Sequence, residues 1–268
     1  MRFHVFLPVK LLASLVRTSA LTLLLANAAA SPPNESPSAE RREPLQPVPS
    51  RPPIRAGEHE SVLRIGGFER RYTLHVPRCY DGTRRLPLVV MLHGGGGTGR
   101  AAARETGWAE KAERQGFLVA FPDALARHPA RAANFVLNPQ LWNDGSDRFY
   151  EGQERVDDVA FLAALLDDIA AHAAVDEHRV FLVGFSNGAS MSFLAGARLA
   201  ARFAAIAPVA GACWTEVPDL TPPVPMCYLT GTADSLKLIE GGVPRMRGGG
   251  SEPVRAGHRP RVRGWAPR

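Results

Sequence analysis

One pentapeptide carries a nucleophile in a pattern suited to acyl transfer: residues 184–188 read G-x-S-x-G, with Ser186 at the centre. An apolar run precedes it and a helix-forming segment follows it, so the pattern predicts a sharp strand-to-helix turn that exposes the serine hydroxyl. The helix N-terminus behind the serine favours developing negative charge. We therefore expect Ser186 to act as a nucleophile. The alternative is a Gly/Ser turn that only begins a helix.

A second motif consists of His93 and the four glycines 94–97 directly after another apolar run. Glycines let the backbone approach a reacting carbonyl closely, and a loop of this type supplies one N–H of an oxyanion hole. The other N–H is expected from Asn187, the residue after the nucleophile. A phosphate-binding loop is excluded because no G-K-[ST] ends the glycine run. We expect His93 itself to be structural.

A third motif, Gly231 to Asp234, follows a late apolar run. In hydrolases with a G-x-S-x-G turn the acid follows the serine and precedes the histidine. Asp234 stands at that place, where a carboxylate orients the imidazole and stabilises its charged form. The alternative is an aspartate that only caps a loop.

With these motifs, the sequence resembles the secreted polyhydroxybutyrate depolymerase and feruloyl esterase family. The resemblance extends over roughly residues 60–242, and further segments that carry it are 86–97, 156–161, 175–180 and 203–211. It implies an α/β-hydrolase fold and hydrolysis of carboxylic esters, such as polyhydroxyalkanoates or feruloyl and acetyl esters of polysaccharides. It also implies that the Gly95 N–H lies in the oxyanion hole. Asp157 and Asp158 match a family motif, although acids at the start of a helix account for both.

The C-terminal region departs from the family pattern. Members carry the catalytic histidine late, in a Gly-Gly-His-type loop after one more strand, whereas here only His258 follows Asp234. No apolar strand precedes His258, and the Arg-rich tail 243–268 is atypical. We therefore expect a sheet without the final strand and helix of the fold. Either His258 serves as the base or the chain is a catalytically impaired relative, because a serine without a base is a weak nucleophile.

The elements that must position these residues alternate between strand and helix. Continuous apolar runs predict strands buried on both faces, and their alternation with helices predicts a mostly parallel, doubly wound sheet. The predicted strands are Ser61–Gly66, Phe68–Pro77, Leu86–Leu92, Phe117–Phe121, Arg179–Phe185, Phe203–Val209 and Val224–Thr230, and the predicted helices are Arg100–Gln115, Val156–Ala174 and Asn187–Ala200. Residues 122–154 are expected to form a long, mostly irregular excursion.

Substrate contacts are expected from loops at the carboxyl ends of the strands, where ligands bind in such sheets. Trp142 and the pair Phe149-Tyr150 lie in the long excursion, and Trp214 follows a later strand. These aromatic residues are candidates for an ester-binding cleft. The alternative for each is ordinary loop packing.

Composition and charge exclude several function classes. The 268 residues are 45% hydrophobic and 22% charged, as in a typical globular protein. The net charge of +6 lies in the tail 243–268, which holds seven Arg and one Glu, so the rest of the chain is neutral and offers no basic field for nucleic acid. No H-E-x-x-H motif or zinc-ligand spacing occurs, and we expect neither a metal nor another cofactor.

The N-terminus has the features of an export signal. Three basic residues precede a short apolar stretch at 18–26, and small residues suited to cleavage follow it, so residues 1–30 are expected to be a signal peptide. An uncleaved membrane anchor is the alternative. Residues 31–57 hold eight prolines and no aromatic residue, which predicts a disordered linker. The hydrolase domain is then expected at 58–242, in a protein secreted to the periplasm or the medium.

Three functions remain open from the residues alone. A secreted serine esterase fits best, a fold-retaining relative without catalysis fits the missing base, and a prolyl-oligopeptidase-like peptidase shares the same triad order. Export implies an oxidising compartment, but the three cysteines (Cys79, Cys213 and Cys227) are an odd number, and their pairing does not follow from the sequence.

Overall fold

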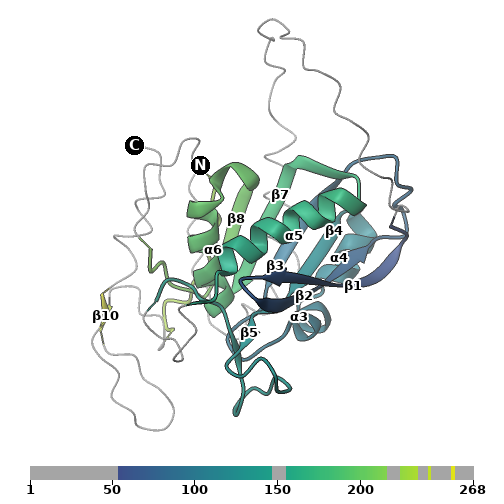
Figure 1. The fold of residues 1–268 in the computed structure, drawn as a ribbon. Helices are drawn as coiled ribbons and strands as arrows, with labels where there is room; N and C mark the ends of the chain where they lie inside the picture. The colour runs from purple at the N-terminus through teal and green to yellow at the C-terminus, as the bar shows by residue number, and fades with distance from the viewer. Residues whose placement is uncertain (1–53, 147–154, 216–223, 235–240, 243–254, 257–268) are drawn as a thin grey trace, which may run out of the picture.

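A computed structural model describes residues 54–146, 155–215 and 224–234, together with the backbone of 241–242 and 255–256 (Figure 1). The predicted signal peptide and nearly all of the predicted linker lie outside the described residues. So do most of the tail, including His258, and the pair Phe149-Tyr150.

A six-stranded sheet forms the centre of the protein, in the order β1-β2-β4-β3-β7-β8. Its strands are β1 (Gly57–Ile65), β2 (Phe68–Val76), β3 (Leu86–Leu92), β4 (Leu118–Pro122), β7 (Val175–Phe185) and β8 (Ala205–Val209). The β1–β2 and β2–β4 pairs are antiparallel, whereas β4, β3, β7 and β8 run parallel to one another. Because all four parallel strands end at the same edge, the loops that follow them meet there.

The segment 224–230 continues the sheet beyond β8, as its apolar run predicts. Two parallel bridges join it to β8, Ile206 to Met226 and Val209 to Leu229. Cys227 N–H donates to the Ile206 carbonyl at 3.0 Å, and Ala210 N–H donates to the Leu229 carbonyl at 2.8 Å. The loop that carries Asp234 therefore begins at the same edge of the sheet as the turn that carries Ser186.

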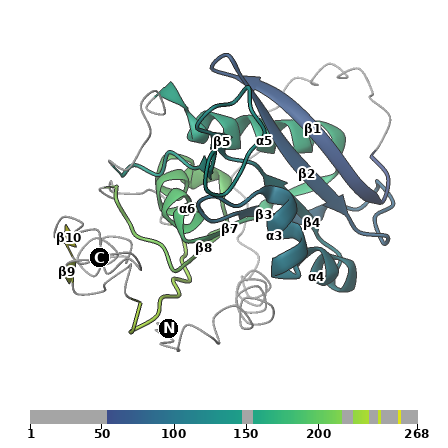
Figure 2. The same ribbon diagram turned by 90° about the horizontal axis from the view of Figure 1, so that it is seen from below.

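Helices cover both faces of this sheet (Figures 1 and 2). They are α3 (Gly99–Thr106), α4 (Trp108–Gln115), α5 (Asp158–His172) and α6 (Asn187–Arg198), and a short 3-10 turn, η2 (Ala200–Arg202), follows α6. Successive residues of β3 point to opposite faces: Leu88 and Val90 pack with residues of α5 and α6, and Val89 and Met91 pack with residues of α3 and α4. Burial on both faces is why these strands are continuous apolar runs rather than alternating ones.

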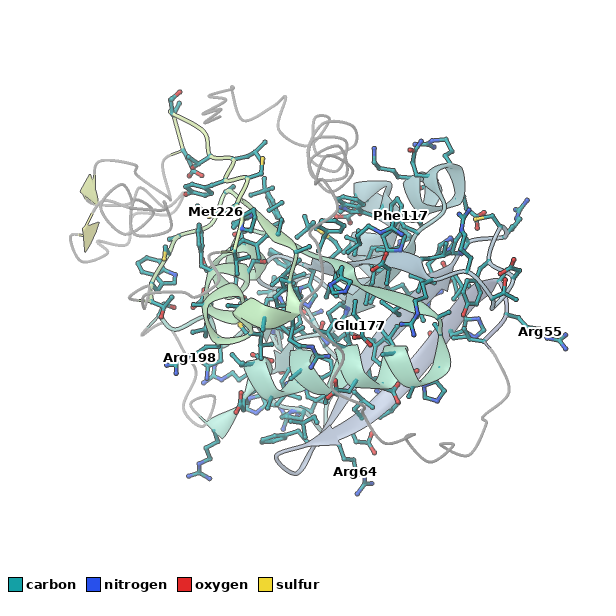
Figure 3. The ribbon with its side chains drawn as sticks, turned by 90° about the horizontal axis from the view of Figure 1, so that it is seen from above. Arg55, Arg64, Phe117, Glu177, Arg198 and Met226 are labelled. Atoms are coloured by element: carbon teal, nitrogen blue, oxygen red, sulfur yellow. The ribbon has the colours of Figure 1, made fainter. Side chains whose placement is uncertain are left out.

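Several predicted elements are confirmed. Gly66 and Gly67 connect β1 to β2 with φ angles of 58° and 85°, the left-handed values that a two-residue hairpin turn needs. Apolar side chains such as Phe117 lie inside, whereas Arg55 and Arg64 extend away from the body of the protein (Figure 3). The hairpin begins one residue before the predicted domain boundary, because Gly57 already pairs with Val76.

The prediction of one helix over Arg100–Gln115 is wrong. Gly107 ends α3 in a left-handed conformation, with φ 70°, and α4 begins directly after it. The break turns the chain so that Ala102 and Trp108 both reach the core on the face of the sheet that carries Val89 and Met91.

The long excursion after β4 is less irregular than predicted. Two short strands, β5 (Leu125–Ala126) and β6 (Gln140–Leu141), pair antiparallel and hold a protruding loop between them. Two further short strands in the C-terminal region, β9 (Gly241–Gly242) and β10 (Arg255–Ala256), pair with each other. Within the described residues, no helix combines the length and apolar character that crossing a membrane requires.

A buried ion pair connects the sheet to α5. Arg70 on β2 is 2% exposed, and its guanidinium donates to Asp158 Oδ1 at 2.5 Å. The guanidinium also lies 4.1 Å from the centre of the Phe161 ring. Asp158 Oδ2 accepts the backbone N–H of Asn143 at 2.7 Å, so the same carboxylate fixes the loop after β6. Asp157 has the capping role expected of it, since its Oδ1 accepts the Ala160 N–H at the start of α5.

Loss of the Arg70 charge is expected to destabilise the protein strongly. Arg70→Met leaves the Asp158 carboxylate buried without its cation, which typically costs about 3–5 kcal/mol in the free energy of unfolding. The double variant Arg70→Met/Asp158→Leu should recover about half of that loss, because no unpaired charge remains. Urea unfolding of the purified full chain measures both values.

The neighbouring arginine provides the matched control. Arg71 is exposed and contacts Glu69 at the surface, so Arg71→Met should change the free energy of unfolding by less than about 1 kcal/mol. Equal losses for the two single variants would contradict a special role for the buried pair.

Candidate active site

Ser186 occupies a strained turn between β7 and α6. Its φ and ψ angles are 53° and −114°, a conformation that typically costs about 1–3 kcal/mol for a residue with a side chain. Two backbone bonds hold it: Ser186 N–H donates to the Val209 carbonyl at 2.9 Å, and its carbonyl accepts the Ser190 N–H at 3.0 Å. Ser186 is half-buried, and it directly precedes the first residue of α6. This is the strand-to-helix turn that the G-x-S-x-G pattern predicts.

Glycines make this turn sterically possible. A Cβ atom at Gly188 would collide with the carbonyl oxygens of His93 and Leu92, and one at Gly184 would collide with the Gly188 carbonyl. A Cβ at Gly211, just after β8, would lie 2.8 Å from the Ser186 carbonyl oxygen. Because these neighbours are backbone atoms that cannot move aside, the three positions require glycine.

The glycine-rich loop lies against the serine turn. A Cβ at Gly94 would lie 3.5 Å from Ser186 Cβ, and one at Gly95 would lie 3.6 Å from Asn187 Cβ. The loop is closed by a hydrogen bond from Gly97 N–H to the Gly94 carbonyl at 2.9 Å. The structure thus brings the two predicted oxyanion residues, Gly95 and Asn187, side by side and next to Ser186. Asn187 begins α6, where a helix leaves its first N–H groups without intrahelical partners.

His93 holds this loop in place through two hydrogen bonds of its imidazole ring. Its Nε2 accepts the Ala124 N–H at 3.0 Å, so the proton is on Nδ1, which donates to the Gly94 carbonyl at 2.8 Å. Burial lowers the pKa of His93 to about 4, with a smaller contribution from the charge of Arg70. The imidazole is therefore neutral near pH 7 and holds the glycine-rich loop to the end of β4, a structural role that agrees with the prediction.

The side chain of Asn187 ties the serine turn to the excursion loop. Its Oδ1 accepts the Trp142 backbone N–H at 2.8 Å, and its Nδ2 donates to the Trp142 carbonyl at 3.1 Å. The same Nδ2 donates to Asp144 Oδ2 at 2.8 Å, and Asp144 is almost completely buried. Asp144 Oδ1 in turn accepts the N–H and hydroxyl of Ser146. All of these contacts hold the residue whose N–H is expected in the oxyanion hole.

The prediction that Trp142 lines the substrate cleft is wrong. Its side chain is 0% exposed, and its indole N–H donates to the His93 carbonyl at 2.9 Å. The ring packs 5.1 Å from the His93 ring, measured between centroids. Trp142 is thus a buried support of the glycine-rich loop. Trp214 is partly buried beyond β8, five residues after Val209, and its contact with substrate remains a prediction.

Asp234 lies in the loop after the segment 224–230. Its backbone N–H donates to the Gly231 carbonyl at 3.3 Å, which closes a turn at the sheet edge. Burial raises the pKa of Tyr228 to about 12, and the Asp234 charge contributes to this rise. The Tyr228 hydroxyl donates at 2.7 Å to the carbonyl of Gly211, the residue that packs against Ser186. Asp234 thus lies near enough to Tyr228 for its charge to act on that residue, whereas His258 lies outside the described residues.

Sequence reasoning missed Asp144 and Arg70. Asp144 follows Trp142 and Asn143 in the chain, in a segment whose aromatic residue was its one predicted substrate contact. An aspartate two residues after a loop tryptophan has no periodicity or spacing that predicts burial.

None of the three cysteines, which all lie in described parts, forms a disulfide; Cys213 Sγ contacts the Thr215 carbonyl at 3.4 Å.

Comparison with known proteins relates this arrangement to ester hydrolases. Residues 70–250, about two thirds of the chain, match the family model described as Esterase PHB depolymerase. A protein of Nocardia uniformis subsp. tsuyamanensis named as an esterase, NocK, is 28% identical over 79% of this chain. Feruloyl esterase B of Piromyces equi is 29% identical over 66% of this chain. Poly(3-hydroxyalkanoate) depolymerase C of Paucimonas lemoignei is 31% identical over 51% of this chain.

These relatives are longer than the region they share with this chain. The matches span 58%, 31% and 30% of the three proteins, respectively. Among solved structures, a pOPH variant in complex with DMSO has a TM-score of 0.58 at 14% identity, covering 79% of this chain and 74% of that one. That likeness concerns the fold alone, which is the α/β-hydrolase fold that the sequence predicts.

The buried neutral His93 predicts a specific dependence of stability on pH. An unfolded histidine takes up a proton near pH 6.5, whereas folded His93 does so only near pH 4. The unfolded state therefore binds more protons between these values, and the free energy of unfolding falls as pH decreases from 6.5 to 4, by about 3 kcal/mol from this residue. Urea unfolding at a series of pH values measures the slope.

Two variants isolate the contribution of His93. His93→Gln should reduce the loss of stability between pH 6.5 and 4, even though it lowers stability at pH 7 by disturbing the loop. His128→Gln, which changes an exposed histidine, should leave the slope as it is in the parent. Parallel curves for the parent and His93→Gln would contradict the assignment.

Proposed function

Because this chain belongs to the esterase PHB depolymerase family, we propose that it hydrolyses carboxylic esters through an acyl-enzyme on Ser186. The observation that carries the proposal is the strained Ser186 turn, packed against Gly94 and Gly95 of the glycine-rich loop. A serine at the start of a helix, with Gly95 and Asn187 beside it as the proposed N–H donors, fits the arrangement that acyl transfer requires.

In the acylation step, Ser186 Oγ attacks the ester carbonyl carbon while a histidine base takes the hydroxyl proton. The carbonyl oxygen becomes an oxyanion and accepts hydrogen bonds from the N–H groups of Gly95 and Asn187. The Asn187 donor is held in place before substrate binds, since its side chain bonds to Trp142 and Asp144. The intermediate then collapses, the C–O bond of the ester breaks, and the alcohol leaves with the proton from the histidine.

In the deacylation step, water attacks the acyl-enzyme and the same histidine takes its proton. The second tetrahedral intermediate uses the same two N–H donors, and its collapse returns the proton to Ser186 Oγ and releases the carboxylic acid. Asp234 is the proposed partner that orients the histidine and stabilises its charged form. His258 is the proposed base, because it is the one histidine that follows Asp234 in the chain.

The proposed substrates are polyhydroxyalkanoates or feruloyl and acetyl esters of polysaccharides. The names of the relatives support this range, since one is a poly(3-hydroxyalkanoate) depolymerase and another a feruloyl esterase. Trp214 remains the proposed aromatic contact for the ester, because it follows β8 at the edge of the sheet where Ser186 lies. The N-terminal sequence supports export, and a polymeric substrate outside the cell would require it.

Hydrolysis of p-nitrophenyl butyrate by the full chain tests the mechanism. Ser186→Ala should lower kcat by at least about 10³-fold, and a fluorophosphonate should label the parent, but not this variant, at Ser186 as detected by mass spectrometry. Ser61→Ala, which changes a serine on β1, should keep the parent rate. His258→Ala should lose as much activity as Ser186→Ala.

The outcomes separate the parts of this proposal. Loss of turnover in the Ser186 variant alone would mean that another group serves as the base. Folded parent protein that neither hydrolyses the ester above the Ser186→Ala background nor accepts the fluorophosphonate label would overturn the proposal and leave a fold-retaining relative without catalysis.

The support that Asp144 gives to Asn187 predicts a second effect on activity. Asp144→Ala removes one of the two acceptors of the Asn187 side-chain amide and leaves the Trp142 carbonyl as the other. The proposed oxyanion donor is then less well fixed, and kcat/KM should fall about tenfold or more. The affinity for butylboronic acid, which places an anionic oxygen in the same site, should fall in parallel.

The control for Asp144 is the aspartate at the start of α5. Asp157→Ala removes a helix cap and should lower stability by about 1 kcal/mol while keeping kcat/KM and boronic acid affinity. If Asp144→Ala lowered the melting temperature but left both of those values unchanged, its role would be structural only.

A further inference from the structure

Three consecutive large apolar side chains are exposed beside the candidate active site. Phe135, Val136 and Leu137 are 71%, 78% and 80% exposed, respectively. They lie in the loop between β5 and β6, and this loop projects away from the sheet beyond β5 (Figure 1). We call these three residues the apolar tip. A run of large apolar side chains in water is unfavourable, and a contiguous one marks an interaction site more often than an isolated residue does.

The loop holds the apolar tip in a defined shape. Asn134 Oδ1 accepts the backbone N–H groups of Val136 and Leu137, both at 3.0 Å. The backbones of Asn134 and Asn138 exchange two further hydrogen bonds of 2.9 and 3.0 Å. The side chain of Asn138 is buried and makes four hydrogen bonds to the backbone of the same loop. Exposure of the tip is therefore built into the loop.

The apolar tip is continuous with the surroundings of Ser186. Each of three successive glycines in the oxyanion loop lies against an apolar side chain. A Cβ at Gly96 would lie 2.6 Å from the Phe135 ring, one at Gly95 would lie 2.8 Å from Leu141, and one at Gly94 would lie 3.1 Å from the Phe185 ring. Phe185, next to the nucleophile, is itself 49% exposed. Apolar surface thus runs from the tip to the serine.

We propose that the apolar tip binds the surface of a water-insoluble aliphatic polyester and so presents its ester bonds to Ser186. The inference rests on the proposed function, because it assigns a substrate phase to that site. A solid surface bound by the tip would lie directly beside the oxyanion loop, because Phe135 packs against Gly96. The material of that surface must therefore itself contain the ester bond that is cleaved. A neutral polyester matches a tip without charged side chains.

A second copy of the chain is a poorer occupant of this surface. A stable protein–protein interface buries about 800 Å² on each partner, and three side chains supply far less. The exposed Arg127 and Arg131 at the base of the same loop would favour an anionic lipid surface, but such binding weakens as salt screens the charges. Binding of a neutral polyester through apolar side chains should not weaken with salt.

Adsorption to amorphous poly(3-hydroxybutyrate) particles tests the proposal. The full chain carrying Ser186→Ala is incubated with the particles so that the polymer stays intact, and the protein left in solution is measured. The added substitutions Val136→Ser and Leu137→Ser should weaken adsorption at least tenfold without changing the melting temperature. Adsorption of the protein without these tip substitutions should be unchanged between 0.05 and about 0.5 M NaCl.

The matched control changes an exposed valine outside the loop. Val62 on β1 is 47% exposed, and Val62→Ser should keep the full adsorption. Unchanged adsorption in the tip variant, or an equal loss in Val62→Ser, would overturn the proposal. Stronger tip-dependent binding to anionic phosphatidylglycerol vesicles than to the particles, or a tip-dependent dimer in sedimentation, would assign the surface to another partner and also overturn it.

The two proposals fail separately. Hydrolysis of soluble p-nitrophenyl butyrate by the parent tests the chemistry at Ser186, whereas adsorption in the Ser186→Ala background involves no chemistry. A parent that is inactive on the soluble ester but adsorbs through its tip would overturn the proposed function and retain a polyester-binding surface.

Discussion

The close backbone approach at Ser186 is the constraint on which the rest of the site depends. The serine is held with φ 53° between a buried strand and a helix, and the chain passes so near to the ends of β3 and β8 that Gly188 and Gly211 have no room for a side chain. Only two residues other than glycine have a positive φ in the described part of the chain, Ser186 and Ala210, and both adjoin this crossing. Such strain persists only where the surrounding packing holds it.

Buried polar contacts hold the loop after β6 and the Asn187 side chain in place. Asp158 accepts from Arg70 on β2 and from the Asn143 backbone, and thereby fixes the loop after β6 to the sheet. The next residues of that loop, through Asp144, hold the Asn187 side chain. Burial raises the pKa of Asp158, and the Arg70 charge opposes that rise. The pair thus links the scaffold to the expected oxyanion donor.

The glycine-rich loop, which is the proposed oxyanion loop, has two different environments on its two sides. On one side, neutral His93 donates to the Gly94 carbonyl and accepts the Ala124 N–H, and the buried Trp142 indole donates to the His93 carbonyl. These bonds hold the loop in one conformation. On the other side, the glycines expose the loop to apolar side chains that include Phe135. A rigid polar support under an apolar rim suits a reaction in which charge develops on one oxygen of an otherwise apolar substrate.

The sequence by itself determined the strands, the serine turn and the glycine loop, because backbone sterics and double-sided burial act locally and leave patterns such as G-x-S-x-G and Leu86–Leu92. It did not determine the break at Gly107, since a single glycine in a helical pattern is usually tolerated. Only the tertiary structure decided the roles of Arg70, Trp142 and Asp144. Their partners are distant in sequence, 88 residues away for Arg70 and 43 for Asp144, and no local pattern records which polar group will be buried beside which. The same holds for the apolar tip, whose place beside the glycine-rich loop follows from the packing of Phe135 on Gly96.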